Sequence, residues 1–123
     1  MPNPFVHSEL ATTDLAKAKE FYGKLFGWKL EDTPMADGST YTMIDVGENE
    51  YGVGGGMMKV PAPDMPSAWL TYVSVDDVAA ATEKVRALGG RVYRDVTEIP
   101  GMGAFSVVAD PTGAALGLWE SRR

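Results

Sequence analysis

The pattern that most constrains the fold of this chain is an internal repeat, in which the second half reproduces the apolar spacing of the first at an offset of 63 residues. Apolar residues recur at the three- and four-residue spacings of one helix face, at Leu15, Ala18, Tyr22 and Leu25. At the offset they correspond, in the same phase, to Val78, Ala81, Val85 and Leu88. A capping acid precedes both helices and a glycine follows both, which predicts two copies of one supersecondary unit.

Segments with the two-residue period of extended chain surround both helices. Around the helix that ends at Gly27 they are 3–12, 28–31, 41–46 and 51–59, and around the second helix they are 68–75, 91–95, 105–109 and 115–120. The chain is therefore predicted to be α+β, with two βαβββ modules whose strands form a curved mixed sheet around a cleft. The modules cover about 3–59 and 68–121 of a single domain, 1–123, and a proline-rich connector, 60–67, joins them.

Composition bounds the class of protein. The 123 residues suit one domain, with 45% hydrophobic and 23% charged residues and no cysteine for a disulfide or thiolate site. A net charge of -6 argues against a nucleic-acid partner or an anionic membrane surface, because both are bound through clustered Lys and Arg. No basic leader and no apolar run near the roughly 20 residues of a membrane span is found. A cytoplasmic location is expected.

A glycine run, Gly52-Val-Gly-Gly-Gly56, lies in the last strand of the first module. It has no adjacent Lys-Ser/Thr pair and no following helix, so it is not a phosphate-binding loop. We expect it to permit a bulge or the close approach of a ligand or a partner backbone.

Several short motifs, in this order and spacing, resemble the vicinal oxygen chelate superfamily, which includes glyoxalase I, bleomycin-resistance proteins and extradiol dioxygenases. They are Thr12-Thr13-Asp14, Phe21-Tyr-Gly-Lys-Leu-Phe-Gly-Trp28, Val75-Asp-Asp77, Leu88-Gly-Gly90, Pro100-Gly-Met-Gly-Ala-Phe105 and Ala109-Asp-Pro-Thr-Gly-Ala114. The resemblance covers nearly the whole chain. In enzymes of this superfamily each module contributes two ligands to a divalent metal in the cleft, one from its first strand and one from its last. The resemblance also implies a homodimer.

Carried over to this chain, the resemblance leaves the metal site incomplete. The first-strand ligand falls on His7, but its mate 63 residues later is Leu70, which cannot bind metal. The last-strand ligand of the second module falls on Glu120, and its mate lies within 52–58, where Met57 offers at best a thioether. Glu9 shares a face with His7 but lies about 7 Å farther along the strand. No cofactor is therefore expected, although a divalent metal held by His7 and Glu120 is possible.

The cleft is predicted to contain His7, Glu9, Leu70, Tyr72, Met57 and Glu120. His7 can contact a ligand, act as a general acid or base, or have a structural role, and Glu9 and Glu120 are the other catalytic candidates. The first hypothesis is a small-molecule-binding protein of glyoxalase or bleomycin-resistance type without a complete catalytic metal site. Alternatives are a metal-dependent lyase, isomerase or dioxygenase that uses His7 and Glu120, and a structural or regulatory dimer with a vestigial cleft.

Overall fold

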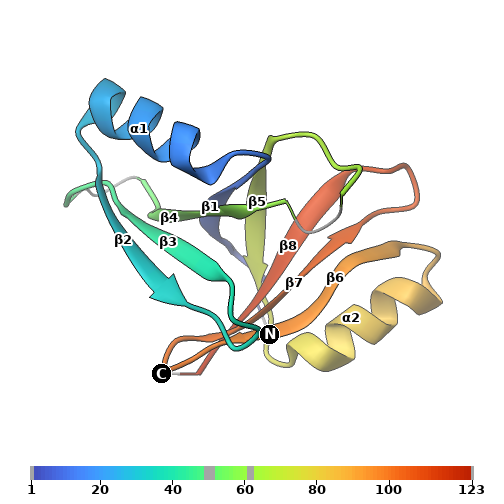
Figure 1. The fold of residues 1–123 in the computed structure, drawn as a ribbon. Coiled ribbons are helices and arrows are strands. Elements are labelled where there is room, and N and C mark those ends of the chain that lie inside the picture. Colours follow the sequence, from blue (N-terminus) through green and yellow to red (C-terminus); the bar gives the residue numbers. More distant parts are fainter. Residues whose placement is uncertain (1, 49–51, 61–62, 123) are drawn as a thin grey trace.

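The computed structural model describes residues 2–48, 52–60 and 63–122, and within them the elements follow one another in two similar sets (Figure 1). The first set is β1 (Phe5–Thr12), α1 (Leu15–Phe26), β2 (Lys29–Pro34), β3 (Thr40–Asp45) and β4 (Gly55–Lys59). The second is β5 (Ala68–Ser74), α2 (Val78–Ala87), β6 (Arg91–Ile99), β7 (Gly103–Ala109) and β8 (Ala115–Ser121). The predicted α+β arrangement of two βαβββ modules is confirmed.

All eight described strands form one mixed sheet in the order β2-β3-β4-β1-β5-β8-β7-β6. The first strands of the two sets, β1 and β5, are antiparallel neighbours at its centre, with His7 opposite Tyr72 and Glu9 opposite Leu70. On either side, β1 runs parallel to β4 and β5 runs parallel to β8. The two halves of the sheet are therefore related by an approximate two-fold axis between the central strands.

The sheet is curved, with both helices outside it (Figure 1). The turn between β2 and β3 reaches the other edge strand, β6, where the Ala36 amide donates a hydrogen bond of 3.4 Å to the Glu98 carbonyl. Asp37 of this turn also forms an ion pair with Arg94 of β6. These contacts join the two edges of the sheet at one end and enclose its concave face.

Both helices begin and end close to where the sequence predicts. Asp14 accepts a hydrogen bond of 3.0 Å from the Lys17 amide, and α1 ends before Gly27, whose φ of 69° is left-handed. Asp77 caps α2 in the same way. The second helix differs at its end, because the left-handed glycine is Gly89 and not its neighbour at the 63-residue offset, Gly90. A side chain on Gly90 would lie 2.7 Å from the Ala109 carbonyl oxygen, so this glycine permits close packing.

Side chains alternate between two faces along most of the sheet, with register shifts in β1 and β6, and this alternation separates three apolar clusters. Outside the sheet, α1 covers Leu10, Ile44 and Met57, and α2 covers a second cluster with Val108 and Leu118. The concave face carries the third and largest cluster, made of Ala11, Met35, Tyr41, Met58, Leu70, Tyr72, Ile99, Phe105 and Val107. Aromatic residues with polar tips on this face place hydrogen-bonding groups inside an apolar core.

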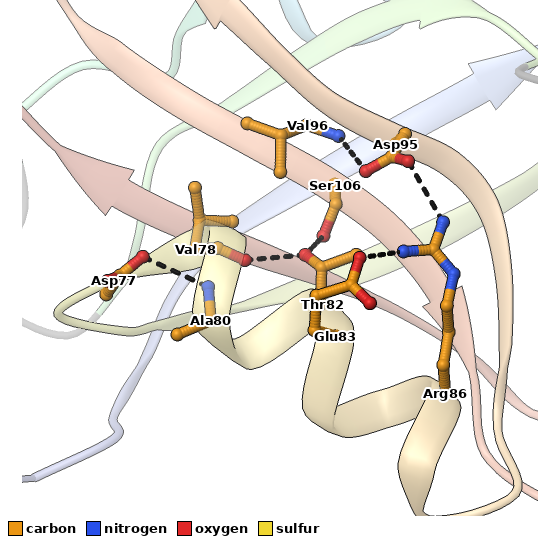
Figure 2. A network of polar contacts seen from close by, with 9 residues as sticks. All are labelled: Asp77, Val78, Ala80, Thr82, Glu83, Arg86, Asp95, Val96 and Ser106. Carbon is orange, nitrogen blue, oxygen red and sulfur yellow. Dashed lines mark hydrogen bonds and ion pairs between the residues drawn. The ribbon is translucent and has the colours of Figure 1, made fainter.

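Polar contacts hold α2 to the sheet (Figure 2). The buried Thr82 hydroxyl donates to the Val78 carbonyl at 2.6 Å and lies 2.8 Å from the Ser106 hydroxyl of β7. Arg86 of the same helix pairs with Asp95 of β6 at 2.9 Å. By contrast, α1 has no fully buried residue. The first helix therefore keeps more of its surface available to solvent or to a partner.

The last strand of the first set is shorter than predicted. It begins at Gly55, whereas Tyr51, the predicted start, lies outside the described residues, as does Pro61 of the predicted connector. Neither described helix is long and apolar enough to cross a lipid bilayer.

Candidate functional site

A cavity of about 300 Å³ opens on the concave face of the sheet. Its walls come from β1, β3, β5, β6, β7, β8 and the turn after β6, so both sets of strands build it. Five of its side chains carry rings, and most of the others are apolar. The lining residues are Val6, His7, Glu9, Tyr41, Met43, Tyr72, Ser74, Ile99, Met102, Phe105, Trp119 and Ser121.

Glu9 is the only carboxyl among the described residues that line this cavity, and it is 1% exposed. Its Oε2 accepts a hydrogen bond of 2.6 Å from the Tyr72 hydroxyl. Burial raises the pKa of Glu9 from 4.5 to about 7, against the smaller lowering effects of hydrogen bonds from Tyr72 and Tyr41 and of the positive charge on Arg94. Glu9 and Tyr72 are separated by 63 residues, so the two modules supply this pair from equivalent positions.

His7 lies next to Glu9 on the same face of β1 and is partly buried. Its Nε2 lies 2.6 Å from the Tyr41 hydroxyl, and its ring meets the edge of the Tyr72 ring with the centroids 5.6 Å apart. Burial lowers the pKa of His7 from 6.5 to about 4. At neutral pH the imidazole is therefore uncharged, and the cavity contains a neutral base beside a carboxyl that binds its proton more tightly than usual.

Two glycines make room for the tyrosines that hold these groups. A Cβ on Gly56 of β4 would overlap the phenol ring of Tyr41, and a Cβ on Gly117 of β8 would overlap the ring of Tyr72. Both tyrosines are nearly completely buried, at 3% and 2% exposed. The close approach predicted for the glycine run is thus made at Gly56 by an aromatic side chain of the same chain, rather than by a ligand or a partner backbone.

The predicted cleft residues separate into three groups. His7, Glu9 and Tyr72 line the cavity together. Leu70 faces the same way but lies in the core below, 4% exposed and outside the lining. Met57 lies on the opposite face with Leu10 and Ile44, next to α1.

Glu120 also lies away from the cavity. Its Oε1 accepts a hydrogen bond of 2.9 Å from the Val78 amide at the start of α2, and its Oε2 accepts one of 2.6 Å from Arg122. Trp119 and Ser121, the neighbours on either side, line the cavity instead. Because side chains alternate along a strand, assigning the ligand position to Glu120 instead of to an adjacent residue places it on the face of the sheet opposite the cavity. Met57 is displaced for the same reason.

These positions do not fit a divalent metal site. His7 and Glu9 are the only imidazole and carboxyl among the described residues of the cavity, and each is engaged by a tyrosine hydroxyl. No group of three or more His, Asp or Glu side chains that could hold an ion occurs among residues 2–48, 52–60 and 63–122. Catalytic metal sites usually have three protein ligands, and this set offers two strong donors. The absence of a cofactor stays a prediction.

Tyr41 is the main site residue that sequence reasoning missed. It was assigned to a strand without a functional role, yet its hydroxyl is the hydrogen-bond partner of His7. The signal was the alternation Tyr41-Thr42-Met43, which places an aromatic and a flexible apolar side chain on one face. Phe105 and Trp119 join the cavity through the same alternation in β7 and β8.

Comparison with known proteins extends these observations. CFP32 of Mycobacterium tuberculosis, a protein named as a glyoxylase, is 40% identical over 116 residues, which cover 94% of this chain and 44% of CFP32. The anthracycline biosynthesis protein DnrV of Streptomyces peucetius is 32% identical over 124 residues, covering 91% of this chain and 45% of DnrV. The chain thus spans less than half the length of these curated relatives.

A solved structure shows the same fold. Methylmalonyl-CoA epimerase from Mycobacterium tuberculosis superposes with a TM-score of 0.64 at 18% identity, covering 97% of this chain and 88% of the epimerase. The family model of the Glyoxalase/Bleomycin resistance protein/Dioxygenase superfamily matches residues 5–118. With the two βαβββ modules and the curved sheet, this match shows that the chain belongs to that superfamily, the vicinal oxygen chelate proteins.

Proposed function

We propose that the chain binds a small organic molecule in the cavity on the concave face, without needing a complete protein-bound metal site. The observation that carries this proposal is the pairing of Glu9 and His7 with two tyrosine hydroxyls in the wall of an open cavity of about 300 Å³. A few convergent polar groups in an otherwise apolar pocket are typical of small-molecule sites.

The lining supports a ligand with a flat or branched apolar part. Phe105 and Trp119 supply ring surfaces, and Met43 and Met102 supply flexible side chains that adapt to irregular shapes. A vestigial cleft would more simply be filled by its own side chains, because protein interiors pack closely. The open volume therefore favours binding over the purely structural alternative.

The metal-dependent alternative loses its proposed ligand pair. His7 lies in the cavity, whereas Glu120 is held at the start of α2 on the other face of the sheet. The two side chains do not converge, so they do not form one metal site. We also retain as a prediction from the sequence that the protein is cytoplasmic.

Filling the cavity tests the proposal. Compounds of about 8 to 15 non-hydrogen atoms, present at a free concentration about 100 times their Kd, should stabilise the chain by about 2.7 kcal/mol. A gain of this size raises Tm by several degrees. Ser74→Leu places a larger side chain in the cavity and should remove these shifts, whereas Thr71→Leu, on the exposed opposite face of β5, should keep them. Thermal unfolding with a panel of aromatic and branched compounds measures both.

Either of two results would contradict the proposal. One is a panel in which no compound raises Tm, and the other is a set of shifts that Ser74→Leu leaves unchanged. Added Mn²⁺, Ni²⁺ or Zn²⁺ serves as a further arm: a stoichiometric metal that His7→Gln abolishes would contradict the metal-independent part.

We further propose that two copies of the chain pair through the outer surface of α1. This α1 surface consists of Phe21, Leu25 and Phe26 of α1 with Trp69 of β5, which are between 44% and 58% exposed. The Trp69 indole joins the helix by donating to the Tyr22 hydroxyl at 3.3 Å. Large apolar side chains grouped on an exposed face mark interaction sites. At the 63-residue offset Phe21 corresponds to Lys84 and Phe26 to Gly89, so the second module lacks this surface. The longer relatives are about twice the length of this chain, so a second copy of the chain would be about as long as the part of them that this chain does not match.

A charge on the α1 surface is expected to separate the two copies. Leu25→Glu should halve the molar mass measured by light scattering after size exclusion, because it buries a carboxylate in an apolar contact. The matched control is Leu88→Glu, since Leu88 occupies the equivalent position on α2 and is 69% exposed. It should leave the mass unchanged. A wild-type chain that is monomeric at micromolar concentration would refute the pairing.

A further inference from the structure

The charges around the cavity are unequal. Among the described residues that line it, Glu9 is the only carboxyl and His7 the only imidazole, and no Lys or Arg is present. Because the pKa of His7 is lowered to about 4, the imidazole contributes no positive charge at pH 7. The carboxyl of Glu9 thus has no cationic partner within the lining.

The titratable and charged groups that interact with Glu9 come from four strands. They are His7 on β1, Tyr41 on β3, Tyr72 on β5 and, at longer range, Arg94 on β6. Arg94 is the only fixed charge of this set, and it lies 5.5 Å above the Phe105 ring. Its charge is already paired with Asp37 and it is not part of the lining. The tyrosines are neutral donors, because burial raises their pKa well above the ordinary value.

Aromatic rings line the cavity together with this carboxyl, and the Tyr72 hydroxyl donates to it at 2.6 Å. The His7 and Tyr72 ring centroids are 5.6 Å apart, and Tyr72 and Phe105 are 6.1 Å apart. Ring faces attract cations through their quadrupole, and a cation that leaves water there gains most when a carboxylate is close. The net charge of -6 adds a long-range attraction for positive ligands.

We propose that the cavity selects molecules in which a protonated amine is attached to an aromatic or branched apolar group, with Glu9 as the counter-charge and the rings of Tyr72 and Phe105 as the wall. This inference rests on the proposed small-molecule function and names its ligand class. A cationic ligand stabilises the negative charge of Glu9, a neutral analogue leaves that charge without a counter-ion, and an anionic ligand is repelled by it.

Three probes of one shape and different charge test the selection: 2-phenylethylammonium, 2-phenylethanol and phenylacetate. By calorimetry at pH 8, the ammonium should bind about tenfold more tightly than the alcohol, and phenylacetate should bind more weakly than either. The advantage of the ammonium should shrink below pH 6, as Glu9 takes up a proton. At pH 7 ammonium binding should release a fraction of a proton, detected as a heat that differs between buffers of different ionisation enthalpy.

Two variants distinguish selection by charge from small-molecule binding itself. Glu9→Gln should bring the ammonium and the alcohol to nearly equal affinity, whereas Glu31→Gln changes the net charge equally at an exposed site on β2 and should leave their ratio unchanged. Alcohol binding by Glu9→Gln reports that its cavity is intact. Equal affinity of the wild type for all three probes, or tighter binding of phenylacetate, would overturn the charge selection and leave the binding function standing. Failure of all three to bind would overturn both.

Discussion

The difference in free energy of unfolding between Glu9→Gln and the wild-type chain is expected to shift by about 3 kcal/mol in favour of the variant as the pH rises from 4.5 to 7. In the folded chain burial lifts the pKa of Glu9 to about 7, whereas the unfolded carboxyl titrates at the ordinary value of 4.5. The stabilising contribution of neutral Glu9 is complete below pH 4.5 and is lost as the pH rises through 7. Glutamine cannot ionise, so the variant escapes this loss.

In the wild-type chain His7 partly offsets this dependence on pH. The lowered pKa of His7, about 4 against 6.5, costs stability as the pH falls from 6.5 toward 4, since the unfolded chain binds the proton first. The contribution of Glu9 changes in the other direction over nearly the same interval. Water reaches His7 more than Glu9, so the histidine effect is the smaller of the two. The sum of the two contributions should therefore vary less between pH 4.5 and 6.5 than the contribution of Glu9 alone.

Single variants should therefore reveal slopes of opposite sign. Glu9→Gln leaves a stability that rises with pH, and His7→Gln, which retains a group able to reach Tyr41, leaves one that falls between pH 4.5 and 7. Urea unfolding followed by tryptophan fluorescence at four pH values measures both, with Glu31→Gln as a control that removes one carboxyl at an exposed site on β2, outside the cavity lining. A constant difference between Glu9→Gln and the wild type would show that Glu9 titrates at its ordinary value.

Gly56→Ala is expected to destabilise the chain by about 1–3 kcal/mol or more, although it adds only one methyl group. The new Cβ overlaps the hydroxyl and the ring of Tyr41, which is 3% exposed and packed in the apolar cluster of the concave face, so the ring must leave its place there. Moving that ring also breaks its hydrogen bond to His7. The matched control is Gly54→Ala, where the nearest atom to an added Cβ is the Ile44 carbonyl oxygen at 3.8 Å, an ordinary contact. It should change stability by less than about 0.5 kcal/mol.

A double-mutant cycle isolates the steric cause. In a Tyr41→Ala background the overlap is gone, so Gly56→Ala should cost much less there than in the wild-type chain. Chemical denaturation of the four proteins gives the coupling free energy. An equal cost in both backgrounds would assign the effect to backbone conformation rather than to the ring of Tyr41.

Much of the fold was predictable because its signals are local. Helix phase, the capping side chains of Asp14 and Asp77, and the left-handed Gly27 each act within a few residues of chain. Their recurrence at a fixed offset then implies a second copy of the same unit, and a unit with one helix can cover only one face of its strands. Gly89 and Gly90 show the limit of this reasoning, because two adjacent glycines can exchange their conformational and packing roles.

The site was predictable only in part, because its members depend on strand parity. His7 and Glu9 are two residues apart on β1, so alternation predicts one face for them, and both line the cavity. The adjacent Val6 also lines it, beside a register shift between Phe5 and His7 that alternation does not predict. In β4 and β8 the family's ligand positions were assigned to Met57 and Glu120, one residue away from the side chains that face the cavity. Both residues therefore lie on the helix-covered face. Tyr41 was missed since nothing nearby in sequence shows that it bonds His7, 34 residues away.

The sequence by itself determined that this chain is built from two βαβββ units and that its second unit lacks a partner for His7, because both conclusions depend on residue identity and spacing. Only the tertiary structure decided what takes the place of that partner. Pairing of β1 with β5 brings Tyr72 against Glu9, and the curvature of the sheet brings Tyr41 against His7. The burial that follows shifts the two pKa values in opposite directions, since desolvation penalises a charge of either sign.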